Sequence, residues 1–174
     1  SCTNASYTDL MKVAAILKGK KVHPDVSLVI SPGSSNVLKM LADNGALSDL
    51  IKAGARILEA SCGPCIGMGQ APKSKAVSVR TFNRNFKGRC GTKDADVYLV
   101  SPETAAAIAI KGAFFDTRTL GDAPTITLPE KFDYEDNYFI FPPESGKDVE
   151  VIMGPNIKPF PRNSELPKTM TANV

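Results

Sequence analysis

Helical and strand-like segments alternate along the first two thirds of the chain, and this alternation limits the possible folds more than any other feature. Residues 7–17 have apolar side chains spaced for one helix face, which consists of Leu10, Val13, Ala14 and Leu17. Short β-branched runs that predict strands occur at residues 26–30, 56–60, 77–80 and 97–100. Right-handed crossovers between such units predict an α/β fold, namely a three-layer α/β/α sandwich with a mostly parallel sheet.

Capping residues predict where two further helices begin and end. We expect Ser48 to cap a short helix that Gly54 ends. We expect Ser101 to cap a later helix that has Pro102 in its first turn and ends at Gly112.

The composition and the sequence pattern of the chain change beyond Asp122. Eight of the thirteen prolines lie from Pro124 onward, and helical periodicity is lost there. We therefore predict an α/β domain in residues 1–122 and a Pro-rich irregular tail in residues 123–174, which wraps the domain or begins an interdomain linker. Residues 138–141 favour one edge strand within this tail. Because the chain starts at Ser1 without a Met, we expect it to be the internal portion of a longer protein, so that the domain is N-terminally incomplete.

Composition and charge exclude several classes of protein. With 174 residues and 43% apolar content, the chain is long enough to bury a core. No apolar run approaches the roughly 20 residues of a membrane helix, and no secretory leader is seen, so we expect the cytoplasm, or the mitochondrial matrix in a eukaryote. The net charge of +3 is spread without a block of like charges, which predicts neither a nucleic-acid partner nor a membrane surface.

Two of the four cysteines form a Cys-x-x-Cys loop directly after the strand at residues 56–60. These are Cys62 and Cys65, and the loop lies at the carboxyl end of a predicted parallel strand, where binding groups gather in α/β sheets. Cys2 and Cys90 are distant in sequence. Cys2 immediately precedes a helix N-terminus, which favours an anionic thiolate.

Three kinds of thiol chemistry fit this pattern. A dithiol redox site of the thioredoxin-like kind would need the first cysteine to open a long helix, which Gly67, Gly69 and Pro72 oppose. A structural zinc site would use the cysteine pair with Cys2, Cys90 or His23. Closed zinc sites usually have two close ligand pairs, however, and His23 lies in a turn typical of a surface histidine.

The third kind is an iron–sulfur cluster bound by Cys62, Cys65 and one distant thiolate, for which Cys2 is the natural candidate. Three protein thiolates on a four-iron cluster leave one iron open to act as a Lewis acid on a substrate hydroxyl and carboxylate.

A loop rich in anion-binding side chains follows the next strand. Arg84 and Arg89 have the geometry to bind the carboxylates of a small polycarboxylic acid, with Asn83 and Asn85 orienting oxygen atoms beside them. The alternative is a solvated basic turn. A second polar loop at the same predicted sheet edge favours a site.

Four short elements in series resemble the aconitase superfamily. They are Ser-Cys-Thr-Asn at residues 1–4, Cys-Gly-Pro-Cys-Ile-Gly at 62–67, Asn-Arg-Asn-Phe-Lys-Gly-Arg at 83–89 and Ser-Pro-Glu-Thr-Ala at 101–105. Their order and approximate separations also agree with the superfamily, and the resemblance covers most of residues 1–120. It implies a [4Fe–4S] hydro-lyase, which isomerises a hydroxy acid by removing and re-adding water.

The resemblance also implies roles for particular residues. Those that it implies as cluster ligands are Cys2, Cys62 and Cys65, and those that it implies for substrate binding are Asn83, Arg84 and Arg89. The catalytic serine base of the family lies in a later domain, so no catalytic residue is expected here and the segment alone should be inactive. Its expected partners are a tri- or dicarboxylic acid substrate and the remaining aconitase domains.

Within the superfamily, Cys-Gly-Pro-Cys is more similar to the aconitate hydratases, which isomerise citrate and isocitrate through cis-aconitate, than to the isopropylmalate isomerase large subunits. Homoaconitase is the nearest alternative. A thiol–disulfide oxidoreductase and a non-catalytic metal-binding domain are the alternatives of another class.

Overall fold

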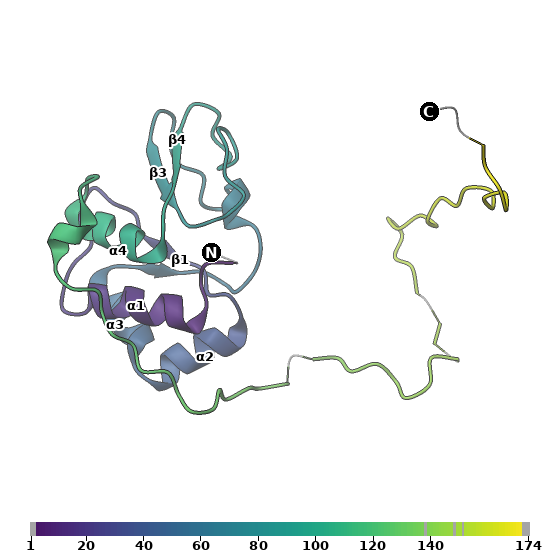
Figure 1. Cartoon of the computed structure of the whole chain (residues 1–174), viewed down its shortest axis with the longest axis horizontal. Helices are drawn as coiled ribbons and strands as arrows, with labels where there is room; N and C mark the ends of the chain where they lie inside the picture. Colours follow the sequence, from purple (N-terminus) through teal and green to yellow (C-terminus); the bar gives the residue numbers. More distant parts are fainter. Residues whose placement is uncertain (1–2, 138, 148, 151, 172–174) are drawn as a thin grey trace. The chain divides into compact units, whose positions relative to one another are not determined.

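The computed structural model describes residues 3–137, 139–147, 149–150 and 152–171. It divides into two units, Ser1–Glu135 and Asp136–Val174, and only the first has helices and strands among its described residues. The elements, shown in Figure 1, are α1 (Tyr7–Leu17), β1 (Val29–Ile30), α2 (Ser35–Asp43), α3 (Ala46–Ala53), β2 (Arg56–Ile57), η1 (Pro64–Ile66), β3 (Val77–Arg80), β4 (Asp96–Leu99), α4 (Pro102–Lys111) and η2 (Thr117–Leu120).

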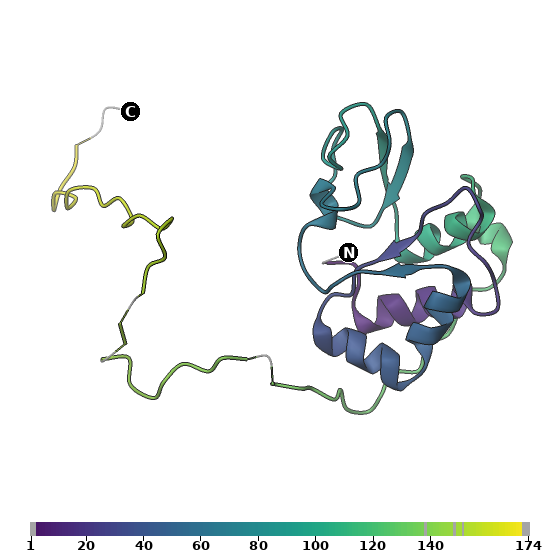
Figure 2. The same cartoon turned by 180° about the vertical axis from the view of Figure 1, so that it is seen from behind.

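The strands form two parallel pairs. β1 pairs with β2 in the register Val29 to Arg56, and β3 pairs with β4 in a register that begins with Val77 opposite Asp96. The β3–β4 pair lies on one side of β1, while α1, α2 and α3 lie on the other (Figures 1 and 2). The predicted α/β class with parallel strands is therefore confirmed. Across the described part of the chain the four strands form two separate pairs and do not join into one sheet.

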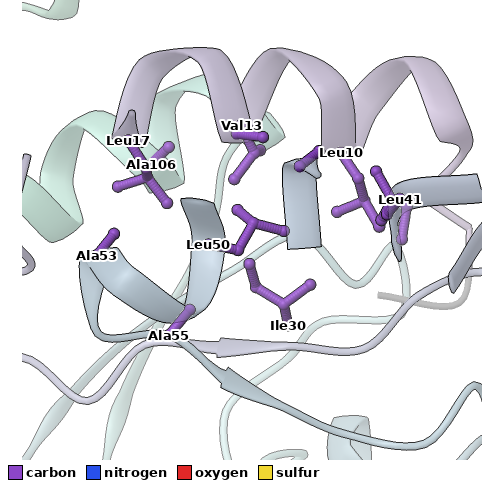
Figure 3. Packing of buried hydrophobic residues seen from close by; sticks show 12 residues of the cluster. Leu10, Val13, Leu17, Ile30, Leu41, Leu50, Ala53, Ala55 and Ala106 are labelled. Atoms are coloured by element: carbon purple, nitrogen blue, oxygen red, sulfur yellow. The ribbon is translucent and has the colours of Figure 1, made fainter. Parts of the chain in front are cut away.

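The core lies between α1, α3 and the β1–β2 pair. Leu10, Val13 and Leu17 point from α1 toward Leu50 of α3 and Ile30 of β1, as Figure 3 shows. Leu17 and Leu50 are fully buried, and burial of each such side chain contributes about 1.5–3 kcal/mol. The predicted apolar face of the first helix is confirmed, and it is what holds α1 in place.

Helix caps agree with the sequence at one predicted position and differ at another. Ser101 accepts a hydrogen bond from the Thr104 amide, so it caps α4 as expected. Ser48 does not cap a helix, because α3 begins earlier, at Ala46. The side-chain oxygen of Asn44 accepts a hydrogen bond from the Ala46 amide, and Gly45, at φ +82°, makes the turn that starts the helix.

The segment 131–135 runs back to α1 and α2. Both the amide and the carbonyl of Glu135 bond to the side chain of Asn36, at 2.8 and 3.2 Å. Lys39 forms an ion pair with Asp133, and the ring of Phe132 makes an edge contact with Tyr7. The first unit therefore extends to Glu135, and a domain boundary at Asp122 stays a prediction.

The second unit contains no helix or strand in its described residues. The strand predicted at residues 138–141 is wrong for residues 139–141, while Tyr138 lies outside the described residues. The side chains of residues 139–141 are exposed, so little apolar burial compensates the entropy of ordering a strand. No helix among the described residues has the length and apolar character to cross a membrane.

Candidate functional site

The Cys62–Cys65 loop follows β2 and is closed by a single 3-10 turn. The amide of Ile66 bonds to Gly63 O and the amide of Gly67 to Pro64 O, each at 3.0 Å. Cys65, inside this turn, is 6% exposed, whereas Cys62 just before it is exposed. The turn ends after three residues at Gly67, so the long helix that a thioredoxin-like dithiol site requires does not follow the first cysteine.

Backbone contact brings this loop against the loop that follows β3. A Cβ atom built on Gly67 would lie 2.2 Å from the carbonyl oxygen of Cys90, and Gly67 has φ +90°. On the opposite side, a Cβ on Gly91 would lie 2.9 Å from Ile66 O. The two loops therefore approach closely because glycine is present on both.

Arg89 connects the two loops chemically. Its Nη2 donates to the Cys65 sulfur at 3.3 Å, while its Nε is buried without a hydrogen-bond partner in the described structure. This hydrogen bond places a cationic donor directly beside the Cys65 sulfur. Arg84 and Asn83, the other residues predicted to bind substrate, are exposed on the same loop.

The N-terminal segment also reaches this loop. The side-chain amide of Asn4 donates to Thr81 O and to Asn83 Oδ1, both at 2.6 Å. Cys2, the third predicted cluster ligand, lies outside the described residues. Asn4 itself lies beside the Asn-Arg loop.

Sequence reasoning missed Arg80, the last residue of β3. This side chain is 7% exposed, and its Nη2 donates to Pro64 O at 3.0 Å and to Cys65 O at 2.8 Å. The sequence predicts Arg80 as a strand residue directly before the Asn-Arg loop, but no local pattern indicates that its side chain bonds to the cysteine loop.

The electrostatics of this region favour an anionic ligand. Burial is the main cause that lowers the pKa of Arg80; the nearby Cys90 and Cys65 sulfurs oppose that shift, and the positive Arg89 adds to it. Three polar atoms, one each on Arg80, Asn85 and Arg89, are buried without a partner among the described residues. The atoms of Arg80 and Arg89 are donors, and Oδ1 of Asn85 is an acceptor; burying either kind is costly unless a ligand or water bonds to it.

The described residues alone do not assemble a complete metal site. Among them, no group of three or more His, Cys, Asp or Glu side chains gathers closely enough to hold a metal ion. Cys90 is a free thiol, 1% exposed, whose Sγ lies 3.6 Å from Thr92 O. His23 packs away from the thiols, against Gly112.

A hollow of about 680 Å³ lies between the β1–β2 pair and β3. Its wall is largely apolar, with Leu28, Leu58 and Val79 among its residues, and it reaches Pro64 and Arg80. Cys62, Cys65, Arg84 and Arg89 do not line it. The thiols and the two predicted substrate arginines therefore belong to a separate surface.

Fold and site together define an α/β domain with parallel strands. In it the cysteine loop and the arginine loop are in contact, and the side chains of Arg80 and Arg89 bring positive charge to Cys65. The sequence profile described as "Aconitase family (aconitate hydratase)" matches residues 1–112. This chain belongs to the aconitase family.

Individual relatives agree with this assignment. The chain is 41% identical to the mitochondrial homoaconitase of Debaryomyces hansenii over 95% of its own length. It is 45% identical to the 3-isopropylmalate dehydratase large subunit of Wolinella succinogenes over 69%, and 42% identical to the homoaconitase large subunit of Thermus thermophilus over 78%. The chain spans only 24%, 29% and 30% of these three proteins, respectively.

Proposed function

We propose that this chain is the cluster- and substrate-binding portion of an aconitase-family hydro-lyase of the homoaconitase or isopropylmalate dehydratase type. The observation that supports this most is the 41% identity to a homoaconitase over 95% of the chain. The relatives are named homoaconitase or 3-isopropylmalate dehydratase, and these names support this type of enzyme. They favour it over aconitate hydratase, which the Cys-Gly-Pro-Cys sequence had favoured. The proposed reaction removes and re-adds water on a small hydroxy acid.

The thiols fit the [4Fe–4S] cluster that the family resemblance implies. Cys62 and Cys65 would bind it together with Cys2, and Arg89, which donates to the Cys65 sulfur, would lie beside that ligand. The unpartnered, buried Nε of Arg89 is consistent with an anionic group that completes this surface. When bound, the cluster supplies an open iron that acts as a Lewis acid.

The arginines of the loop after β3 would bind and orient the substrate. Arg84 is exposed and has its guanidinium available for paired hydrogen bonds to a carboxylate. Arg89 donates to the Cys65 sulfur, so a carboxylate bound to the guanidinium of Arg89 would be held close to the thiols. Asn83, whose Oδ1 accepts from Asn4, would orient a further substrate oxygen.

The remaining parts of the proposed active site would come from other domains or subunits. The segment spans about a quarter of its relatives, and two of those relatives are named large subunits. Its proposed partners are therefore the remaining aconitase domains and a di- or tricarboxylic acid. Alone, it would bind a ligand without turning it over. The Debaryomyces relative is named as mitochondrial, which supports a matrix location if the source is eukaryotic.

Aconitate hydratase is the second candidate. The Cys-Gly-Pro-Cys sequence favours it, and the matching family profile is described by that activity. Turnover of homoaconitate, 3-isopropylmalate and aconitate by the intact protein distinguishes the candidates. Homoaconitate or 3-isopropylmalate as the best substrate supports the first proposal, whereas aconitate as the best substrate supports the second.

Substitution of Arg89 tests the substrate-binding role. Arg89→Lys in the intact protein should raise KM by about tenfold or more while iron content is retained, because an ammonium cannot reproduce the paired bonds of a guanidinium. Arg118→Lys is the control, since Arg118 is exposed and pairs with Asp116 outside the loop. An unchanged KM in Arg89→Lys would contradict the assignment.

A further inference from the structure

Arg80 is a buried arginine that the proposed function does not use. It ends β3, directly before the Asn-Arg loop, and its side chain crosses to the cysteine loop rather than to solvent. Burying a guanidinium is costly, and here no carboxylate pairs with it in the described structure. We therefore expect the buried Arg80 to contribute to the structure or function of the site.

Its hydrogen bonds are directed at the backbone of the cysteine turn. Nη2 donates to two consecutive carbonyl oxygens, Pro64 O at 3.0 Å and Cys65 O at 2.8 Å. Pro64 O also accepts the Gly67 amide that closes the 3-10 turn. One cationic nitrogen therefore bonds to both peptide groups that set the orientation of Cys65.

Arg80 is itself held in a fixed orientation. Its Cζ lies 4.9 Å from the centroid of the Phe82 ring, and its backbone is part of the four-residue β3–β4 ladder. Arg89 contacts the same cysteine from the opposite end, at the sulfur. Cys65 thus has one arginine on its backbone and another on its side chain.

We propose that Arg80 is a positioning residue that fixes the Pro64–Cys65 backbone and thereby holds the Cys65 sulfur against Arg89. Its consequence for cluster binding rests on the proposed function, but its effect on the thiol does not. Without Arg80 the turn opens locally, and the sulfur becomes accessible while the rest of the domain stays folded.

Alkylation of individual thiols tests this in the iron-free intact protein, read by mass spectrometry. Arg80→Met keeps the apolar stem and removes the donors, so it should raise the rate at Cys65 by about tenfold or more. Cys62, already exposed, should change less than about twofold. Cys90, 1% exposed, should stay unreactive, and an unchanged urea-unfolding midpoint shows that the domain as a whole stays folded.

Two further variants complete the test. Arg80→Lys retains one charged donor but not the planar guanidinium over the Phe82 ring, so it should restore only part of the Cys65 protection. Arg56→Met is the matched control, because Arg56 also lies on a strand and makes two hydrogen bonds, to Ser27 and Gln70, but none to the cysteine turn. The proposal is overturned if Arg80→Met leaves Cys65 protected, or if Cys65 and Cys90 become reactive together.

Iron uptake separates this proposal from the proposed function. In the reconstituted protein, Arg80→Met should lose iron in air several-fold faster than the unsubstituted protein. If the unsubstituted protein takes up no cluster while Cys65 protection still depends on Arg80, the cluster assignment fails and the positioning role stands. If a cluster forms but neither Cys65 protection nor iron loss depends on Arg80, the positioning role alone fails.

Discussion

At the scale of single residues, the site depends on its glycines as much as on its thiols. Gly67 allows the cysteine turn to touch the backbone at Cys90, and this contact is what brings Arg89 within 3.3 Å of the Cys65 sulfur. Gly69 has a similar positive φ of +63°, but nothing lies within 4 Å of the position that its Cβ would take. Substitution of Gly69 by alanine therefore introduces backbone strain alone, whereas substitution of Gly67 introduces backbone strain and a steric clash.

Alanine substitution at these glycines should give different losses of stability. Gly69→Ala should cost about 1 kcal/mol, because alanine disfavours a left-handed backbone. Gly67→Ala adds a clash with Cys90 O and should cost about 2 kcal/mol more. Urea denaturation of the chain measures both. Equal losses in the two variants would show that the contact between the loops does not contribute to stability.

At the scale of elements, the first residue of each helix depends on which side chain accepts the hydrogen bond from a free amide at the helix start. Ser6 and Asp9 form a reciprocal capping box at α1, in which the Ser6 hydroxyl accepts the Asp9 amide and the Asp9 carboxylate accepts the Ser6 amide. Ser48 looks similar in sequence but lies inside α3. The Asn44-Gly45 turn starts that helix three residues earlier than a cap at Ser48 would.

The two serines should respond differently to alanine. Ser6→Ala removes a cap and should lower the free energy of unfolding by about 1 kcal/mol. Ser48→Ala lies in a helix interior on an exposed side chain, so it should change stability by less than about 0.5 kcal/mol or raise it slightly. Thermal or urea unfolding of both variants checks this. A larger loss at Ser48 would contradict the observed start of α3.

At the scale of the whole molecule, sequence patterns predicted the features that depend on local chemistry. The apolar face of α1, the strand at residues 77–80 and the Ser101 cap all follow from periodicity, β-branched residues and capping preference. The length of β1 did not follow, since only two of the five residues predicted to form this strand, Val29 and Ile30, pair with β2. Strand length depends on neighbours that are distant in sequence.

The candidate site shows the same division. The sequence predicted that the cysteine loop follows one strand and the arginine loop the next, and both positions are confirmed. The shared sheet edge expected for them is wrong in the described structure, because β2 and β3 belong to different two-stranded sheets. The bond between Arg89 and Cys65, the contact of Gly67 with Cys90, and the burial of Arg80 all depend on residues 15 to 24 positions apart, and no local pattern encodes them. Arg80 was therefore visible in the sequence as a strand residue but not as part of the site.

The central claim is that Cys62 and Cys65, and not Cys90, bind an iron–sulfur cluster in the intact protein. Iron content and visible absorbance after anaerobic reconstitution test it most directly, in the unsubstituted protein and in Cys62→Ser, Cys65→Ser and Cys90→Ser. We predict a four-iron cluster that is lost in the first two variants and retained in Cys90→Ser. Full iron content in Cys65→Ser, or stoichiometric zinc in place of iron, would contradict the account.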